Sequence, residues 1–156
     1  MDTEYILKEL KKSLDGDEDI ESGLCALEEG GKADMLFIQH KNFGRADFTA
    51  GGSFFFAVNE GEEAAVFHSE IIVAEDIPGD LIPFICTEIA VDNMNIPAGR
   101  LIFDPESRNV ACSLTVAIPE SLTLEDALAQ ADNCAAVLLS LASVYAGKYN
   151  QLVREE

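Results

Sequence analysis

The residues GGSFFFAVNEGEEAAVFHSEIIVAED, from Gly51 to Asp76, contain two apolar runs separated by a short polar segment. The first run, Ser53 to Val58, is aromatic, and the second, Ala64 to Ala74, is rich in Val and Ile. Between them, Asn59-Glu60-Gly61-Glu62 has the composition of a turn. β-Branched and aromatic residues on both sides of a Gly-containing turn are typical of a β-hairpin. We therefore predict two antiparallel strands in this stretch.

The composition limits the class of protein and its partners. The chain has 156 residues, of which 48% are hydrophobic, and its 29 acidic and 10 basic residues give a formal net charge of −19. This length and hydrophobicity predict a single folded domain over residues 1–156. The negative charge repels phosphate backbones and anionic lipids, because binding to either depends on Lys and Arg. We therefore expect no nucleic acid and no membrane as a partner, but a basic or amphipathic polypeptide.

The N-terminus and the cysteines indicate a cytoplasmic protein. Met1-Asp2-Thr3-Glu4 shows neither the basic nor the apolar region of a secretory signal. No apolar run approaches the ~20 residues that cross a bilayer. The cysteines at positions 25, 86, 112 and 134 lie far apart, without a C-x-x-C spacing. They are predicted to be free, mostly buried thiols rather than a disulfide pair or a zinc site.

Upstream of the hairpin, the sequence predicts a short amphipathic helix over Thr3 to Leu14, capped by its first residue. The acidic run Asp15 to Glu21 resembles the start of an EF-hand loop, but Ile20 stands where that loop needs Gly and Ala26 where it needs Glu. We interpret the run as a solvated linker, and leave open weak binding of a divalent ion. Asp34 to His40 is apolar on both faces and predicts a strand covered on each side. A longer connection over 41–52 follows.

Downstream, a helix is predicted to begin at Asp80, its cap, and to end at Pro97 with Gly99. Its expected buried stripe consists of Ile82, Ile85, Cys86 and Ile89. A second hairpin then pairs Arg100–Asp104 with Asn109–Ile118. The last helix, Leu124 to about Val153, carries a wide, Ala-rich apolar stripe that favours packing against a sheet over an intermolecular coiled coil. The order α-β-β-β-α-β-β-α predicts an α+β domain with an antiparallel sheet packed by helices.

The strand over 109–118 alternates cleanly. One face carries Val110, Cys112, Leu114, Val116 and Ile118, and the other carries Ala111, Ser113, Thr115 and Ala117. The second face is small and uncharged, whereas a face in water usually carries charged or long polar groups. Two explanations stay open, a partner-binding surface formed by Ala111, Ser113, Thr115 and Ala117, and a lightly exposed face with small residues by chance.

No set of residues indicates catalysis. His40 and His68, the two histidines, lie in predicted strands outside any known motif. No nucleophile elbow, zinc-protease motif, phosphate-binding loop or dinucleotide fingerprint is present. Glu88 and Asp92 lie four apart on the middle helix and are expected to face water. We therefore predict a protein that is not an enzyme, with no catalytic residue, cofactor or metal.

The order of elements, together with the stretch Asn95-Ile96-Pro97-Ala98-Gly99-Arg100-Leu101-Ile102-Phe103-Asp104 leading into the final hairpin and helix, resembles the type III secretion chaperone-like fold and, within it, the YbjN-like family of small bacterial proteins. The likeness is topological and compositional and includes no diagnostic motif. It implies a non-enzymatic protein that binds other polypeptides, often as a homodimer.

Two hypotheses for function follow. The first is a cytoplasmic protein-binding module, chaperone-like or regulatory, whose partner adds along a sheet edge or lies on exposed sheet surface. The alternative is a small-molecule or ion-binding domain with a cleft between the sheet and the middle helix. The alternative requires His40, His68 and an acidic cluster to meet in one pocket.

Overall fold

The computed structural model describes residues 1–31, 33–58, 61 and 63–154. Over these residues the chain forms a six-stranded, wholly antiparallel sheet in the order β1-β2-β3-β4-β6-β5. The elements along the chain are α1 (Thr3–Leu14), β1 (Ile20–Cys25), β2 (Met35–His40), β3 (Ala50–Ala57), β4 (Ala64–Ala74), the 3-10 turn η1 (Gly79–Leu81), α2 (Ile82–Asn95), β5 (Arg100–Asp104), β6 (Asn109–Pro119) and α3 (Leu124–Arg154). The predicted α+β class with an antiparallel sheet is confirmed.

The β3–β4 hairpin predicted from Gly51 to Asp76 is present. Its register places Phe54 opposite Ser69 and Phe56 opposite Phe67. Phe54 and Phe67 point into the core, where both side chains are fully buried and their rings stack 6.1 Å apart. Residues 59, 60 and 62 of the predicted turn lie outside the described residues. This aromatic pair forms part of the core between the sheet and the helices.

The sequence did not predict β1: its first two residues, Ile20 and Glu21, belong to the acidic run interpreted as a linker, and for them that prediction was wrong. β1 pairs with β2 from Ile20 opposite His40 to Cys25 opposite Met35. The observed order is therefore α-β-β-β-β-α-β-β-α, with one strand more than the predicted α-β-β-β-α-β-β-α. The strand escaped prediction because IESGLC is short and only Ile20 and Leu24 face the core, which leaves a weak alternation.

Strand β2 is covered on one face, not on both as predicted. Leu36 and Ile38 are buried toward the helices, whereas Phe37 between them is 45% exposed on the opposite face. The connection that follows is shorter than predicted, because β3 already begins at Ala50. The sheet therefore has a covered inner face and an open outer face.

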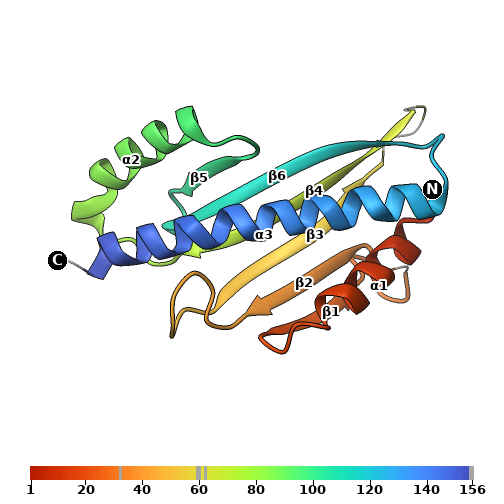
Figure 1. The fold of residues 1–156 in the computed structure, drawn as a ribbon, viewed down its shortest axis with the longest axis horizontal. Coiled ribbons are helices and arrows are strands. Elements are labelled where there is room, and N and C mark those ends of the chain that lie inside the picture. Colours follow the sequence, from red (N-terminus) through yellow and green to blue (C-terminus); the bar gives the residue numbers. More distant parts are fainter. Residues whose placement is uncertain (32, 59–60, 62, 155–156) are drawn as a thin grey trace.

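The helices lie on the inner face (Figure 1). Asp2, rather than the predicted Thr3, caps α1, since its carboxylate accepts a hydrogen bond from the Tyr5 N–H at 3.0 Å. α3 crosses the inner face and contacts β4 and β6, which confirms the predicted packing of the last helix against the sheet. Its buried residues are mostly small: Ala127, Ala131, Cys134, Ala135, Leu138, Ala142, Ala146 and Tyr149.

By length and composition alone, α3 qualifies as a helix that could cross a membrane. The expectation that no apolar segment reaches this length therefore does not hold. In this fold, however, the composition of α3 has a local cause. The helix has 31 residues and buries one apolar side against the sheet along most of its length.

The loop between β2 and β3 packs against α3 through Gly44. This residue has a φ of 70°, and a Cβ added to it would lie 2.3 Å from the Ser143 carbonyl oxygen and 2.8 Å from the Ala146 Cβ. Any side chain would overlap the helix at this position. Glycine thus allows the loop to approach the α3 backbone.

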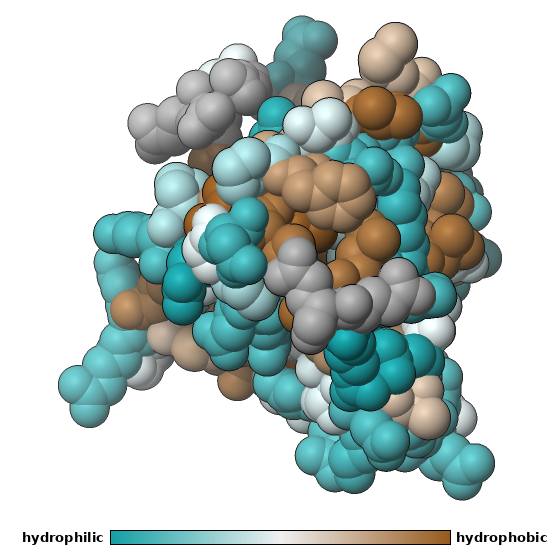
Figure 2. All heavy atoms as spheres, turned by 90° about the vertical axis from the view of Figure 1, so that its left-hand side faces the viewer, coloured by the Kyte–Doolittle hydropathy of each residue, from teal (hydrophilic) through white to brown (hydrophobic). Residues whose placement is uncertain are grey.

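Helix α2 lies beside the C-terminal turns of α3 (Figure 1). It follows η1 directly, so Asp80 lies in that turn and gives α2 no side-chain cap. Of the predicted stripe, Ile85 and Ile89 are buried, Ile82 is half-buried, and Cys86 is exposed. Its opposite side leaves exposed the apolar residues Phe84, Val91 and Met94. Figure 2, which faces the end of the molecule near α2, shows hydrophobic residues at the surface between hydrophilic ones.

Candidate polypeptide-binding surfaces

The outer face of the sheet carries the four residues singled out as a partner-binding surface. Ala111 is 8% exposed, Ser113 is half-buried, and Thr115 and Ala117 are exposed. None of the helices formed by the described residues lies over this face (Figure 1). The four residues therefore lie on an open sheet surface, with Ala111 packed down between its neighbours.

Register extends this surface across the neighbouring strands. Thr115 lies opposite His68, His68 opposite Phe55, and Phe55 opposite Met35. The rings of Phe55 and His68 stack with centroids 4.8 Å apart, and the Thr115 hydroxyl lies 3.4 Å from His68 Nδ1. We call the continuous row Met35, Phe55, His68 and Thr115 the outer row.

Charges are sparse on the outer face compared with the rest of this acidic chain. Strand alternation places on it the described charged residues Glu21, Glu70, Arg100 and Asp104. Glu70 and Arg100 both lie opposite Ser113, one on each side of β6. The acidic residues that give the net charge of −19 therefore lie mostly elsewhere.

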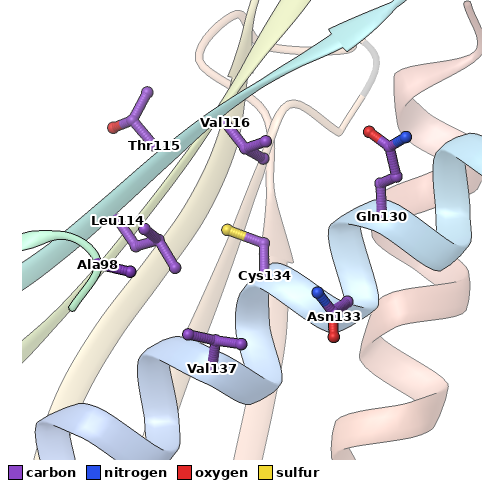
Figure 3. Close-up of a pocket in the computed structure, with 8 residues that line it drawn as sticks. All are labelled: Ala98, Leu114, Thr115, Val116, Gln130, Asn133, Cys134 and Val137. Carbon is purple, nitrogen blue, oxygen red and sulfur yellow. The ribbon is translucent and has the colours of Figure 1, made fainter.

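A second candidate surface lies between β6 and α3. A pocket of about 360 Å³ opens there, with Leu114 and Val116 on one side and Cys134 and Val137 on the other. Figure 3 shows these four side chains turned toward the gap and Thr115 turned away from it. The lining residues are uncharged, and their apolar surface suits the aliphatic side chains of a ligand.

The two histidines do not meet. His40 belongs to the inner side of β2, where its ring contacts Phe43 at 4.8 Å and its Nε2 lies 3.9 Å from Asp17. His68 belongs to the outer row. The convergent pocket that the small-molecule or ion-binding alternative requires is therefore not formed by these residues. The pocket described above lies between β6 and α3, rather than between the sheet and α2.

The cysteines are free thiols, two buried and two exposed. Cys112 and Cys134 are buried, whereas Cys25 and Cys86 are exposed, so the prediction of mostly buried thiols holds for half of them. Burial raises the pKa of the Cys112 thiol to about 11. Burial also raises the pKa of Cys134, against the opposing effect of the hydrogen bond with Ser69. Both buried thiols stay protonated near neutral pH, which makes them poor nucleophiles.

Within the described residues, no group of His, Cys, Asp or Glu has the arrangement of a metal site. In the acidic run from Asp15 to Glu21, the carboxylates make local hydrogen bonds. Asp15 accepts hydrogen bonds from Lys11, at 2.6 Å, and from the Ser22 hydroxyl. The Asp17 carboxylate accepts the Asp19 N–H at 2.9 Å. These carboxylates are used by local contacts of the α1–β1 connection.

A half-buried polar cluster, which the sequence did not predict, joins α2 to α3. Glu88 and Asp92 were expected to face water, but Lys148 Nζ lies 2.9 Å from Glu88 and 2.7 Å from Asp92. The Tyr149 hydroxyl donates to Asp92 at 2.6 Å. Burial lowers the pKa of Lys148, but its hydrogen bonds to Asp92 and Glu88 outweigh burial, and the pKa is raised. One Lys148 ammonium thus contacts two carboxylates, and the cluster links α2 to α3.

No protein-family model and no curated protein matches this chain.

Proposed function

We propose that this protein is a non-enzymatic polypeptide-binding module, chaperone-like or regulatory, that works as a homodimer. The observation that carries the proposal is the open, sparsely charged outer face of the sheet on a chain with a net charge of −19. Exposed sheet surface with few charges and with apolar side chains such as Met35 and Phe55 is a candidate protein interaction site. The resemblance of the stretch from Asn95 to Asp104, with the hairpin and helix that follow it, to secretion chaperone-like proteins supports the same class of function.

The charges on the outer face are complementary to those of a second copy. Glu70 and Arg100 lie on opposite sides of Ser113, each one strand away. In the proposed dimer, the outer faces of two copies pack against each other, and a two-fold axis runs between them, directly over β6 and parallel to it. Rotation about this axis places the β4 side of one copy over the β5 side of the other. Glu70 of each copy therefore faces Arg100 of the other. The small side chains of Ala111, Ser113, Thr115 and Ala117 allow the two sheets to approach closely.

Light scattering coupled to size-exclusion chromatography tests the dimer. We expect the wild type to have twice the mass of the 16.9 kDa chain. Arg100→Glu gathers like charges at the contact and should yield monomer, and so should Glu70→Arg. The double variant Glu70→Arg with Arg100→Glu exchanges the two charges and should restore the dimer.

Thr115→Arg introduces a long cation at the centre of the contact and should also give monomer. Val144→Arg serves as its control, because Val144 is 69% exposed on α3, and α3 lies on the inner face of the sheet. A wild-type monomer at every concentration would reject the dimer. A dimer that survives Thr115→Arg and both single charge reversals would place the contact elsewhere.

A further inference from the structure

Strand β6 extends beyond the strand that covers its outer edge. β5 pairs with it only from Arg100 opposite Ser113 to Asp104 opposite Asn109. On the other side, β4 pairs with β6 as far as Pro119. Among the described residues, Leu114–Ile118 therefore have a strand on one side only. In Figure 1 this half of β6 forms the edge of the sheet beyond the end of β5.

The peptide groups of Thr115 and Ala117 face the open edge. The Leu114 carbonyl oxygen accepts a hydrogen bond from the Ser69 hydroxyl of β4 at 2.7 Å, so it faces β4. The Ser113 carbonyl oxygen faces the side of β5, since a Cβ added to Gly99 would lie 2.5 Å from it. Backbone groups alternate in direction along an antiparallel strand. Hence the N–H and C=O of Thr115 and Ala117 point away from β4, and they can pair with an added strand.

An apolar groove follows this edge on the inner side. The pocket of about 360 Å³ between β6 and α3 adjoins another of about 420 Å³, and Ala98 and Val137 line both. Pro97 and Leu141 contribute to the second pocket, and neither pocket is lined by a charged residue. A strand paired with Thr115 and Ala117 would direct every second side chain into this groove.

The charge around the groove selects the ligand. Glu63 and Glu120 lie at the end of β6 away from β5, where the Glu120 N–H donates to the Glu63 carbonyl at 2.9 Å. The chain as a whole carries a net charge of −19. Lysine or arginine on a ligand would therefore be attracted at long range, and acidic residues would be repelled.

We propose that the open edge of β6 binds an extended segment of a separate polypeptide, with apolar residues at alternate positions and basic residues at its ends. The segment pairs with Thr115 and Ala117 and places its apolar side chains between Leu114 and Val137. Five residues of strand span about 17 Å, which sets the length of the recognised core. The inference rests on the proposed binding of polypeptides, but not on the outer face as a dimer contact.

A synthetic peptide, Lys-Lys-Val-Thr-Val-Thr-Val-Lys-Lys, with a fluorophore at its N-terminus, tests the proposal by fluorescence anisotropy. We expect saturable binding to the wild type. Thr115→Pro removes the N–H that faces the open edge, and should weaken binding at least about tenfold, whereas Thr115→Ala keeps that N–H and should bind within about twofold of the wild type. Circular dichroism of each variant establishes that the fold is retained.

Two arginine variants of α3, one in the groove and one outside it, test whether the peptide occupies the groove. Val137→Arg fills the groove and should weaken binding at least about tenfold, whereas Val144→Arg, the same change on exposed surface of α3, should not. The same peptide with Glu in place of Lys should bind at least about tenfold more weakly than the lysine peptide.

Three results would overturn the inference. The first is absence of saturable binding by the lysine peptide. The second is binding that Thr115→Pro and Val137→Arg leave unchanged. The third is a dimer that Thr115→Pro converts to monomer while Arg100→Glu does not, because the edge would then pair with a second copy of this chain. If instead the wild type is monomeric and the peptide still binds as described, only the proposed dimer fails.

Discussion

At the scale of single residues, Tyr149 should make the free energy of unfolding depend on pH in the alkaline range. Its burial, its hydrogen bond to Asp92 and the charge of Asp92 all raise its pKa above the ordinary value near 10. The folded protein therefore keeps a proton that the unfolded chain releases above about pH 10. The free energy of unfolding should fall as the pH rises above 10, by up to about 1.4 kcal/mol per pH unit from this group.

Urea unfolding at pH 8, 10 and 11 measures this effect. Tyr149→Phe removes the titrating group, so its free energy of unfolding should fall less steeply between pH 10 and 11 than that of the wild type. Some decline remains in the variant, because the raised pKa of Cys112 acts in the same direction. Equal slopes for the two proteins would show that Tyr149 releases its proton without cost in the folded state.

The cysteines give a second prediction at this scale. Cys25 and Cys86 are exposed and should react quickly with a thiol reagent such as Ellman's reagent at pH 8, whereas Cys112, which is 1% exposed, should react only when the chain unfolds. Mass spectrometry after partial labelling identifies the modified positions. Rapid labelling of Cys112 would mean that the inner face of β6 becomes uncovered readily in the folded protein.

At the scale of elements, Gly44 couples the β2–β3 loop to α3. Gly44→Ala combines a positive φ with overlap against the Ser143 carbonyl, and should lower the free energy of unfolding by about 2 to 4 kcal/mol. Gly30 is the control, since it has a φ of 76° but nothing within 4 Å of an added Cβ. Gly30→Ala should cost only about 1 to 2 kcal/mol. Equal losses in thermal or urea unfolding would assign the whole effect to backbone strain.

Elements with strong periodicity could be predicted from sequence, and weakly patterned contacts could not. The β3–β4 hairpin and α3 follow from runs of aromatic, β-branched or Ala-rich residues. β1 was missed because only Ile20 and Leu24 mark its inner face. The ion pairs of Lys148 link residues far apart in sequence, so spacing within α2 alone gave no sign that Glu88 and Asp92 had a partner.

The open edge of β6 could have been found from sequence. Counting outward from the turn at 105–108 places Arg100 opposite Ser113 in the predicted hairpin, which leaves the end of the second strand unpaired on that side. The groove could not have been found in this way. Its second wall is Val137, and the position of Val137 depends on how α3 crosses the sheet.

At the scale of the whole molecule, the net charge of −19 gives the two proposed associations opposite dependence on salt. Raising sodium chloride from 50 to 500 mM screens the repulsion between two copies of charge −19 and also the attraction between Glu70 and Arg100; we expect the loss of repulsion to be the larger effect, so the dimer should become tighter. The same change screens the attraction for the lysine peptide, whose binding should become weaker. Sedimentation equilibrium measures the dimer, and fluorescence anisotropy measures peptide binding, at both salt concentrations. If salt changed both associations in the same direction, the net charge would not govern one of them.

The position of α3 at the end of the element order has a consequence for synthesis on the ribosome. Every strand is translated before the helix that covers the inner face, so Phe54 and Phe67 have emerged while α3 is still being made. At 5 to 20 residues per second, translating the 31 residues of α3 takes about 2 to 6 s. During that interval the nascent sheet exposes apolar surface on both sides. The growing chain is then at risk of aggregation, and α3 ends that risk when it covers the inner face.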